Sequence, residues 1–396
     1  MPGPLEGIKV IDVSAVVSGP LAAMILGDQG ADVLKIEPPG IGEVVRLPNF
    51  ERGGLTSLFI NCNRNKRGVA LDLSKPEGQA VMHELIKDTD VFIQNWRPGA
   101  AERIGMGPDT LRGINPDLIY CSISGFGPTG PYAGQRVYDP IIQGLTGHAG
   151  IQMSPDFPIP DLVRNIVADK STSYTAAQAI TAALFARDRG AGGQLIEVPM
   201  IDASLAFFWP DGMIKHTLQN SAELRGNSLY ETYRLWHTQD GQIIYFVASQ
   251  VEHEGLFRAL DHPEWIEDTR FATTESRMNP DNAEVLGALL DEAIRGFNTE
   301  TLLQRMSDNE VPSGRVLTLE EVFDDPQIQH NGSILEFDHP SAGKYQQAKP
   351  AAKFHGTPQD PRRRMPPLLG EHTEEVLTEL GLSAAAIEEL REKGVL

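Results

Sequence analysis

Cations and amides are concentrated in one short run of an otherwise acidic chain. The run from Asn61 to Arg67, with the sequence NCNRNKR, directly precedes a predicted strand, and Arg97 and Arg103 follow the next predicted strand. The carboxyl ends of strands in an open α/β sheet are where ligands bind. Together these side chains could hold the phosphates of a nucleotide-like ligand by charge-assisted hydrogen bonds. The alternative is that they are ordinary surface cations.

Asp169 is a second candidate for chemistry, because it stands between an apolar run and a helix rich in small residues. A carboxylate in that place commonly caps the helix by accepting a backbone N–H. It can also act as a nucleophile. The local sequence leaves both interpretations open.

Familiar catalytic motifs do not account for the chain. The sequence contains no Walker loop, no H-E-x-x-H and no G-x-S-x-G. The glycine motif from Gly125 to Gly130 contains Pro128 and has no acidic residue about 20 positions later, so it is interpreted as a turn and not as a dinucleotide loop. The acidic triplet from Glu252 to Glu254 is interpreted as a solvated loop, and no metal is expected.

The elements that must position these residues alternate between strand and helix. Apolar strands are predicted at 8–13, 32–36, 69–73, 90–94 and 118–122, with helices at 20–27 and 76–87. This pattern indicates βαβ units and a parallel sheet in an α/β, Rossmann-like large domain. A helix at 173–186 carries alanines on nearly every face and is expected to be closely packed.

A smaller α+β domain is predicted after residue 224, because strands at 233–237 and 242–248 are followed by charged helices. The predicted domains are therefore 1–224 for the first part of the large domain, 225–330 for the small domain, and 331–396 for a C-terminal segment.

Composition limits the function and the compartment. The 396 residues carry a formal net charge of −20, which opposes binding to a phosphate backbone, so no nucleic-acid partner is expected. Two cysteines provide no disulfide framework, and the sequence shows neither a signal peptide nor an apolar run of about 20 residues. We expect a cytoplasmic protein with no membrane partner.

The chain resembles the family III CoA-transferases, the group of the formyl-CoA and carnitine CoA-transferases, which are related to the α-methylacyl-CoA racemases. The resemblance extends over nearly the whole chain and is carried by the segments LEGIKVIDV, SGPLAAMILGDQGADVLKIEPPG, NRNKRGVALDLSKPEG, NWRPGAAERIG, INPDLIYCSISGFGPTGPY, VYDPIIQGLTG, ARDRGAGGQLIEVPMIDASLA and LLGEHTEEVLTELGLS.

This resemblance implies an interlocked homodimer in which the C-terminal segment returns to the large domain, the CoA-binding domain. It implies an enzyme that binds coenzyme A or acyl-CoA as substrate, with no tightly bound cofactor, and transfers CoA to a carboxylic acid. The residues implied to bind CoA are Val16, Val17, Leu71, Asp72, Leu73, Ser74, Asn95, Trp96, Arg97, Arg103 and Arg136.

Asp169 matches the catalytic aspartate of that family. A carboxylate that attacks a thioester forms a mixed anhydride, which keeps the acyl group activated, and then an aspartyl-CoA thioester. The resemblance assigns supporting roles to Tyr138, Ser18, Gly19 and Glu254, with the backbone N–H groups at Ser18 and Gly19 stabilising oxyanions.

Two differences from relatives affect specificity. Formyl-CoA transferases have glutamine where Val17 stands, and a glycine-rich loop where this chain has 249–255. A larger or less polar acyl group is therefore expected than formate or oxalate.

The alternative function is an acyl-CoA racemase or isomerase, which needs a second acid or base facing Asp169. Racemases have histidine at the position of Tyr138, so His148 or Glu254 would have to take that role here. A CoA-binding protein without activity is a third hypothesis, which the presence of Asp169 disfavours.

Overall fold

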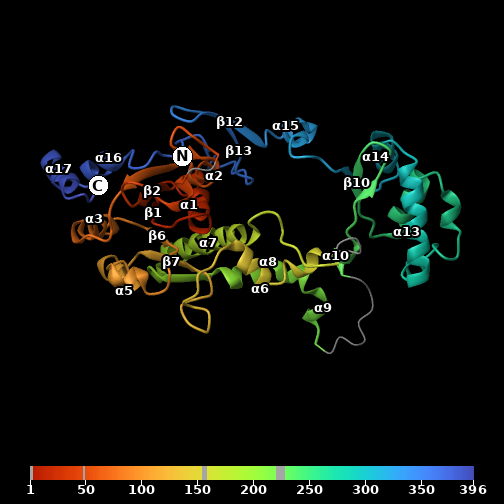
Figure 1. Cartoon of the computed structure of the whole chain (residues 1–396), viewed down its shortest axis with the longest axis horizontal. Coiled ribbons are helices and arrows are strands. Elements are labelled where there is room, and N and C mark those ends of the chain that lie inside the picture. Colours follow the sequence, from red (N-terminus) through yellow and green to blue (C-terminus); the bar gives the residue numbers. More distant parts are fainter. Residues whose placement is uncertain (1–2, 48–49, 154–157, 220–227) are drawn as a thin grey trace. The chain divides into compact units, whose positions relative to one another are not determined.

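The computed structural model describes residues 3–47, 50–153, 158–219 and 228–396 (Figure 1). The chain forms two compact units, a large unit of Met1–Pro210 with Gly332–Leu396 and a small unit of Asp211–Asn331. The domain boundary expected from the sequence at 224/225 lies outside the described residues.

A parallel sheet of six strands forms the centre of the large unit. Its order is β5-β2-β1-β6-β7-β8, and every neighbouring pair is parallel. Numbered along the chain, this is the order 3-2-1-4-5-6 of the Rossmann fold, with its reversal between β1 and β6. The strands are β1 (Lys9–Asp12), β2 (Asp32–Glu37), β5 (Lys66–Ala70), β6 (Val91–Gln94), β7 (Ile119–Ser124) and β8 (Leu195–Pro199).

Helices cover both faces of this sheet because alternate strand residues point to opposite sides. On one face, Val10 and Ile93 belong to a core shared with α1 (Ser18–Asp28), α6 (Asp139–Leu145) and α7 (Val167–Ala186). On the other face, the core contains Ile11, Phe92 and residues of α3 (Pro76–Ile86), α5 (Pro108–Ile114), α16 (Thr373–Glu379) and α17 (Ala384–Glu392). The result is a three-layer α/β/α arrangement.

Small residues explain the close packing of α1 on α7. Ala22 and Ala23 of α1 and Ala176 of α7 are fully buried in one core. The helix expected at 173–186 begins six residues earlier, at Val167, so Asp169 lies in its first turn. The helix expected to start at Pro20 begins at Ser18, and Pro20 is tolerated there because the first N–H groups of a helix have no intrahelical partner.

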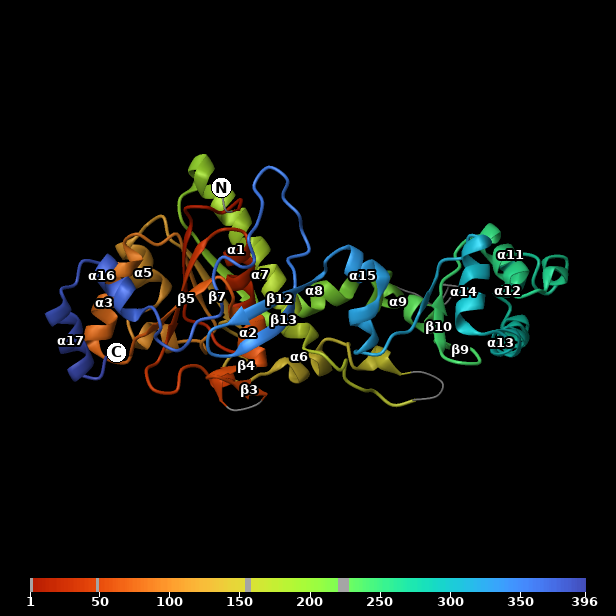
Figure 2. The same cartoon turned by 90° about the horizontal axis from the view of Figure 1, so that it is seen from above.

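The C-terminal residues pack onto the edge strand β5. Asn65 donates its backbone N–H to Arg364 O (3.0 Å), and the N–H of His372 donates to Gly68 O (2.8 Å). Both views place α16 beside α3 (Figures 1 and 2), and Asp72 N donates to Val395 O (2.8 Å). The large unit is therefore built from segments at both ends of the sequence.

The small unit contains an antiparallel sheet in the order β11-β10-β9, formed by β9 (Trp236–His237), β10 (Gln242–Tyr245) and β11 (Ser313–Arg315). Its core joins this sheet to α11 (Gln250–Ala259), α13 (Pro280–Arg295) and α14 (Thr299–Asp308). The other helices of this unit are α9 (Ile214–Thr217), α10 (Leu229–Thr232), η5 (Pro263–Ile266), α12 (Thr274–Arg277), η6 (Glu321–Asp324) and α15 (Pro326–His330).

The remaining elements begin in the large unit: η1 (Val44–Arg46), β3 (Glu51–Arg52), β4 (Leu55–Thr56), α2 (Ser57–Asn63), α4 (Ala100–Arg103), η2 (Gly150–Gln152), η3 (Arg187–Ala191), α8 (Met200–Gly212), β12 (Ile334–His339) and β13 (Gly343–Ala348). Within the described ranges, no helix has both the length and the apolar character needed to span a membrane.

Candidate active site

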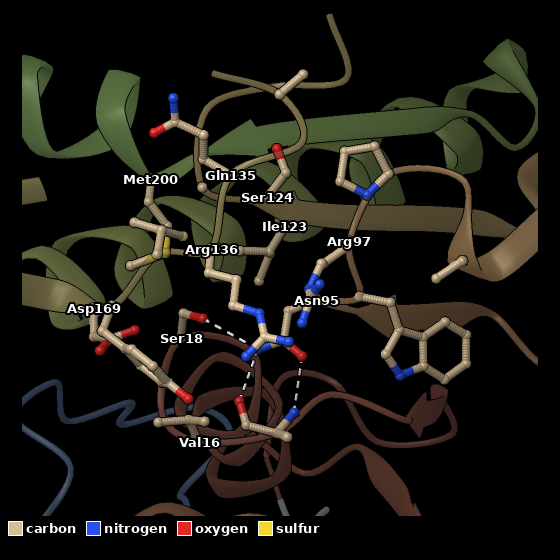
Figure 3. A pocket seen from close by; sticks show the side chains of 18 of the residues that line it. Val16, Ser18, Asn95, Arg97, Ile123, Ser124, Gln135, Arg136, Asp169 and Met200 are labelled. Carbon is tan, nitrogen blue, oxygen red and sulfur yellow. Dashed lines mark hydrogen bonds between the residues drawn. The ribbon is translucent and has the colours of Figure 1, made fainter. Parts of the chain in front are cut away.

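A pocket of about 560 Å³ opens where the strand order of the large sheet reverses. Its floor comes from the segments that follow β1, β6, β7 and β8 at their carboxyl ends, which is where open α/β sheets bind ligands. Figure 3 shows Asp169 and Met200 at one side of this view and Arg97 toward the other. The lining includes Ala15, Val16, Ser18, Asn95, Trp96, Arg97, Arg103, Ile123, Ser124, Gly125, Gln135, Arg136, Val137, Tyr138, Asp169 and Met200.

Asn95 holds the segment between β1 and α1 at the edge of this pocket. Its Oδ1 accepts the N–H of Ala15 (2.9 Å), and its Nδ2 donates to Ala15 O (2.7 Å) and to Ser18 Oγ (3.5 Å; Figure 3). These contacts tie the ends of β1 and β6 together across the reversal point. Asn95 is therefore a structural clamp as well as a pocket residue.

Asp169 is a buried carboxyl group in the first turn of α7, with 7% of its surface exposed. Burial, followed by the negative charge of Asp139, raises the pKa of Asp169 from 3.8 to about 6. Hydrogen bonds from the backbone and hydroxyl of Ser18 partly oppose this rise. At neutral pH the group is mostly ionised, yet it is a stronger base than an exposed aspartate.

Asp139 caps the helix that carries Asp169. Its Oδ2 accepts the N–H groups of Ala168 (2.7 Å) and Asp169 (3.1 Å), while Ile166, at the N-cap position, provides no side-chain hydrogen bond. Gln143 Nε2 donates to Asp139 Oδ1 (2.5 Å). The interpretation of Asp169 as the helix cap is wrong, because Asp139 accepts these backbone N–H groups.

Sequence reasoning missed Asp139. Its place before Pro140 is typical of a helix start, and it does begin α6. No local pattern shows that the same carboxylate caps a second helix 29 residues further along the chain.

Three arginines give the pocket a strongly cationic wall. Arg97, Arg103 and Arg136 line it, and no ion pair is found for any of them in the part of the chain that the structure describes. The local concentration of positive charge contrasts with the net charge of −20. Such a wall favours an anionic ligand.

The structure brings together in this pocket Val16, Ser18, Asn95, Trp96, Arg97, Arg103, Arg136, Tyr138 and Asp169, all expected site residues. Other expected residues lie outside its lining. Val17 is 2% exposed and is not part of this lining, so its effect on acyl-group specificity stays a prediction.

Gly19 is required for packing and does not line the pocket. A Cβ atom at this position would lie 2.1 Å from Ser14 Oγ and 2.3 Å from Ser14 Cβ. Glycine therefore allows the start of α1 to approach the segment that follows β1.

The segment Leu71, Asp72, Leu73 and Ser74 lies after β5, at the same edge of the sheet but outside the pocket lining. There Asp72 Oδ1 accepts hydrogen bonds from the N–H (2.9 Å) and the hydroxyl (2.6 Å) of Ser74.

The interpretation of residues 61–67 as a phosphate site is wrong. Strand β5 begins at Lys66, three residues before the expected strand, so its cations enter the interior. Arg64 pairs with Asp28 (2.7 Å), Lys66 with Asp12 (2.8 Å) and Arg67 with Asp32 (2.7 Å). These cations hold elements together and are neither ligand-binding groups nor free surface charges.

His148, the candidate racemase partner within the large unit, does not line this pocket. His148 is 5% exposed and packs against the rings of Phe207 and Phe208. Glu254 belongs to the small unit, where it forms an ion pair with Arg258 (2.9 Å). Glu252 completes the N-terminal capping box of α11 with Ser249.

Metal-binding side chains are not clustered in the described ranges, since no group of three or more His, Cys, Asp or Glu is placed to hold an ion. The triplet 252–254 lies within helix α11, so its interpretation as a loop is wrong.

Comparison with known proteins identifies the family. The model of CoA-transferase family III matches residues 5–373. The chain belongs to this family. Family III members among its relatives include the succinyl-CoA:glutarate CoA-transferase of Homo sapiens, which is 32% identical over 398 residues, or 99% of this chain and 90% of the human protein. The succinate–glutarate CoA-transferase of Agrobacterium fabrum is 33% identical, over 95% of this chain and 96% of that protein.

A solved structure gives the same assignment. A CAIB/BAIF family protein from Brucella suis superimposes with a TM-score of 0.82 at 30% identity, covering 96% of this chain and all of that one. The family III resemblance expected from the sequence is confirmed, and this member is a CoA-transferase. The parallel central sheet of its mixed α/β fold is confirmed as well.

Proposed function

We propose that this enzyme moves coenzyme A between two carboxylic acids by using Asp169 as a covalent carrier. One observation carries the proposal: Asp169 is the single carboxyl group that lines the pocket in the described parts of the chain. Its position at the buried side of a cationic pocket provides a nucleophile together with a site for an anionic substrate.

Each step exchanges one carboxylate or thiolate for another, so no net proton is consumed. The Asp169 carboxylate attacks the thioester carbonyl and expels CoA thiolate, which leaves a mixed anhydride of Asp169 and the first acid. The thiolate attacks the Asp169 carbonyl, which releases the first acid and forms an aspartyl-CoA thioester. The second acid attacks this thioester to form a second anhydride, and thiolate attack on its acyl carbonyl gives the new acyl-CoA and restores Asp169.

The surroundings of Asp169 suit this role. Its raised pKa makes the carboxylate a better nucleophile than an exposed one, while ionisation at pH 7 is retained. Burial restricts the access of water, which would hydrolyse an anhydride. The Ser18 N–H and hydroxyl, which interact with the carboxylate, are placed to stabilise the oxyanion that forms when thiolate attacks Asp169.

The cationic wall is proposed to hold the phosphates of CoA. Arg97, Arg103 and Arg136 supply charge, and Trp96 and Asn95 continue the lining on that side. Leu71, Asp72, Leu73 and Ser74, at the same sheet edge, are proposed to take the nucleotide end beyond the pocket. Glu254 and the backbone of Gly19 remain proposed supporting groups.

A racemase is the second candidate, but the pocket disfavours it. Proton removal and return at an α carbon need two acid/base groups. Within the described residues the lining contains Asp169 and Tyr138 but no histidine and no second carboxyl group.

The human and Agrobacterium relatives are named as CoA-transferases of succinate and glutarate, so dicarboxylic acids form the first panel of acceptors to test.

We also propose that the active form is an interlocked homodimer. Large apolar side chains on two helices of the large unit are exposed in the single chain: Tyr174 (63%) and Phe185 (60%) on α7, and Phe207 (61%) on α8. Exposed apolar groups of this size favour burial against another protein surface. A second copy of this chain would cover them.

The central experiment compares wild type with Asp169→Ala, using succinyl-CoA and glutarate, oxalate and other acids. Wild type should form new thioesters and, in the presence of hydroxylamine, a hydroxamate at Asp169 that mass spectrometry locates. Asp169→Ala should lose transfer and hydroxamate formation but keep CoA binding. Asp109→Ala, an exposed first-turn aspartate of α5, serves as the matched control. Substantial transfer by Asp169→Ala would overturn the mechanism.

A further inference from the structure

Glu43 is a buried carboxylate that connects the charged interior to the pocket. It lies between β2 and η1 and is 6% exposed. Its Oε1 is 3.1 Å from Lys35 Nζ, and its Oε2 accepts the N–H of Val16 at 2.6 Å. One side chain therefore contacts both a buried cation and a pocket-lining backbone group.

Lys35 fixes the position of the Glu43 carboxylate. Lys35 is fully buried, donates to Ser14 O, and lies 3.8 Å from Asp12 Oδ2. Burial alone would lower the pKa of its ammonium group, but Asp12, Glu43 and Glu37 together raise it, so the charge is retained. The backbone of Glu43 is held as well, because its N–H donates to Glu37 Oε2 (3.1 Å). Glu43 has little freedom to move.

Val16 adopts a backbone conformation that its side chain disfavours. Its φ is +69°, in the left-handed region, which is a genuine outlier for a β-branched residue. Such a conformation persists only where surrounding contacts impose it, and strained residues of this kind are concentrated at functional sites. The backbone N–H of this strained residue is held directly by Glu43, to which it donates a hydrogen bond.

The strained residue controls the direction of the chain into α1. Val16 is two positions before Ser18, which lines the pocket together with Asp169 and whose backbone and hydroxyl lower the pKa of the Asp169 carboxyl. A relaxed, negative φ at Val16 would rotate the following peptide groups away from their present orientation. The position of Ser18 relative to Asp169 therefore depends on the conformation of Val16.

We propose that Glu43 is a positioning residue of the active site, which holds Val16 in the left-handed conformation so that Ser18 meets the Asp169 carboxylate. This inference rests on the proposed function of Asp169 and deepens it. A purely structural role, in which Glu43 only neutralises Lys35, would affect stability without a specific effect on the chemical step.

The test uses Glu43→Gln, which keeps the shape but removes the charge, and Val16→Gly, which removes the strain because glycine readily adopts positive φ. Glu43→Gln should lower kcat about ten- to a hundredfold with little change in KM for acyl-CoA, and should slow hydroxamate formation at Asp169 by the same factor. In the Val16→Gly background, Glu43→Gln should lower kcat less than about threefold.

Asp28→Asn is the matched control, because Asp28 is a buried carboxylate paired with Arg64 in the same unit and does not line the pocket. It should keep wild-type kcat. If Glu43→Gln behaves like Asp28→Asn while Asp169→Ala is inactive, the inference about Glu43 is wrong and the proposed function stands. If wild type itself transfers no CoA to any acid, the proposed function fails.

If wild type proves inactive, a double-mutant cycle on stability still tests whether Glu43 holds Val16. Urea unfolding of wild type, Glu43→Gln, Val16→Gly and the double variant should show coupling, with the effect of Glu43→Gln on the folding equilibrium constant at least about fivefold smaller in the glycine background. Additive effects would overturn the inference.

Discussion

Replacing Asp169 with asparagine should stabilise the folded protein at pH 7, although it removes the proposed nucleophile. The pKa of the Asp169 carboxyl is raised from 3.8 to about 6, by burial and then by the charge of Asp139. An acid whose pKa is raised by folding binds its proton more tightly in the folded state than in the unfolded chain. Its ionisation at neutral pH therefore opposes folding.

The size of this effect follows from the same values. The interval from 3.8 to about 6 corresponds, at about 1.4 kcal/mol for each pH unit, to a penalty of about 3 kcal/mol at pH 7. Asparagine carries no charge and keeps an oxygen that can accept from Ser18. We expect the free energy of unfolding to rise by roughly 1 to 3 kcal/mol.

The size of this penalty depends on pH in a defined way, while its sign stays the same. Well below pH 3.8 the carboxyl is protonated in both states, so the penalty is absent; it grows between pH 3.8 and about 6 and is nearly constant above that. Urea unfolding of wild type and Asp169→Asn, at one protein concentration, should show a large difference at pH 7.5 and a much smaller one at pH 4.5.

The control is Asp109→Asn, at an exposed position in the first turn of α5. Its free energy of unfolding should fall by up to about 1 kcal/mol, because a negative charge at a helix N-terminus is favourable. Because the two substitutions should change the free energy of unfolding in opposite directions, they separate the effect of burial from that of the helix dipole. An Asp169→Asn protein no more stable than wild type at pH 7.5 would refute the reasoning about the buried carboxylate.

The remaining predictions concern rate, packing, specificity and assembly. The rate of Asp169 acylation should rise with pH through an apparent pKa near 6 and then level off, because only the carboxylate attacks; a flat profile from pH 5 to 8 would contradict this. Gly19→Ala should destabilise the protein by roughly 1 to 3 kcal/mol, because the added Cβ would clash with Ser14. Adding Ser14→Gly should restore most of the thermal stability, and a double variant as unstable as Gly19→Ala would show that Ser14 is not the cause. Tyr138→Phe should slow transfer about ten- to a hundredfold without eliminating it, and 2-methylacyl-CoA in deuterated water should gain no deuterium; rapid incorporation dependent on Asp169 would favour the racemase. Size measurements at nanomolar concentration should give about twice the 43.3 kDa chain mass, and an active monomer would exclude the interlocked dimer.

The regular part of the fold could be predicted because its strands are continuous apolar runs. Strands β1, β2, β6 and β7 lie within a few residues of the expected positions. Strand β8, with the sequence LIEVP, was not among the expected strands. Strand β5 was placed too late because it starts with Lys66 and Arg67, and a charged strand is possible there only because distant carboxylates neutralise it.

The site could be predicted only where a local motif carries the residue. Strand and helix positions pointed to Arg97, Arg103 and Asp169, and the resemblance added Ser18, Arg136 and the role of Asp169. Asp139 and Glu43 act through contacts with residues remote in the sequence, a helix N-terminus in one case and a strained peptide in the other. Their burial and their partners come from tertiary structure, and no spacing rule describes them.

The return of the C-terminal residues to β5 has a consequence for synthesis of the chain. The face of the sheet that packs against α16 and α17 stays exposed until residues 373–392 have left the ribosome. At about 5 to 20 residues per second, the segment between Pro210 and the end of the chain takes roughly ten to forty seconds to make. During that interval β5 is an open edge beside an uncovered apolar surface, a form that associates readily with other chains. We therefore expect nascent chains arrested before residue 373 to bind chaperones more strongly than complete ones.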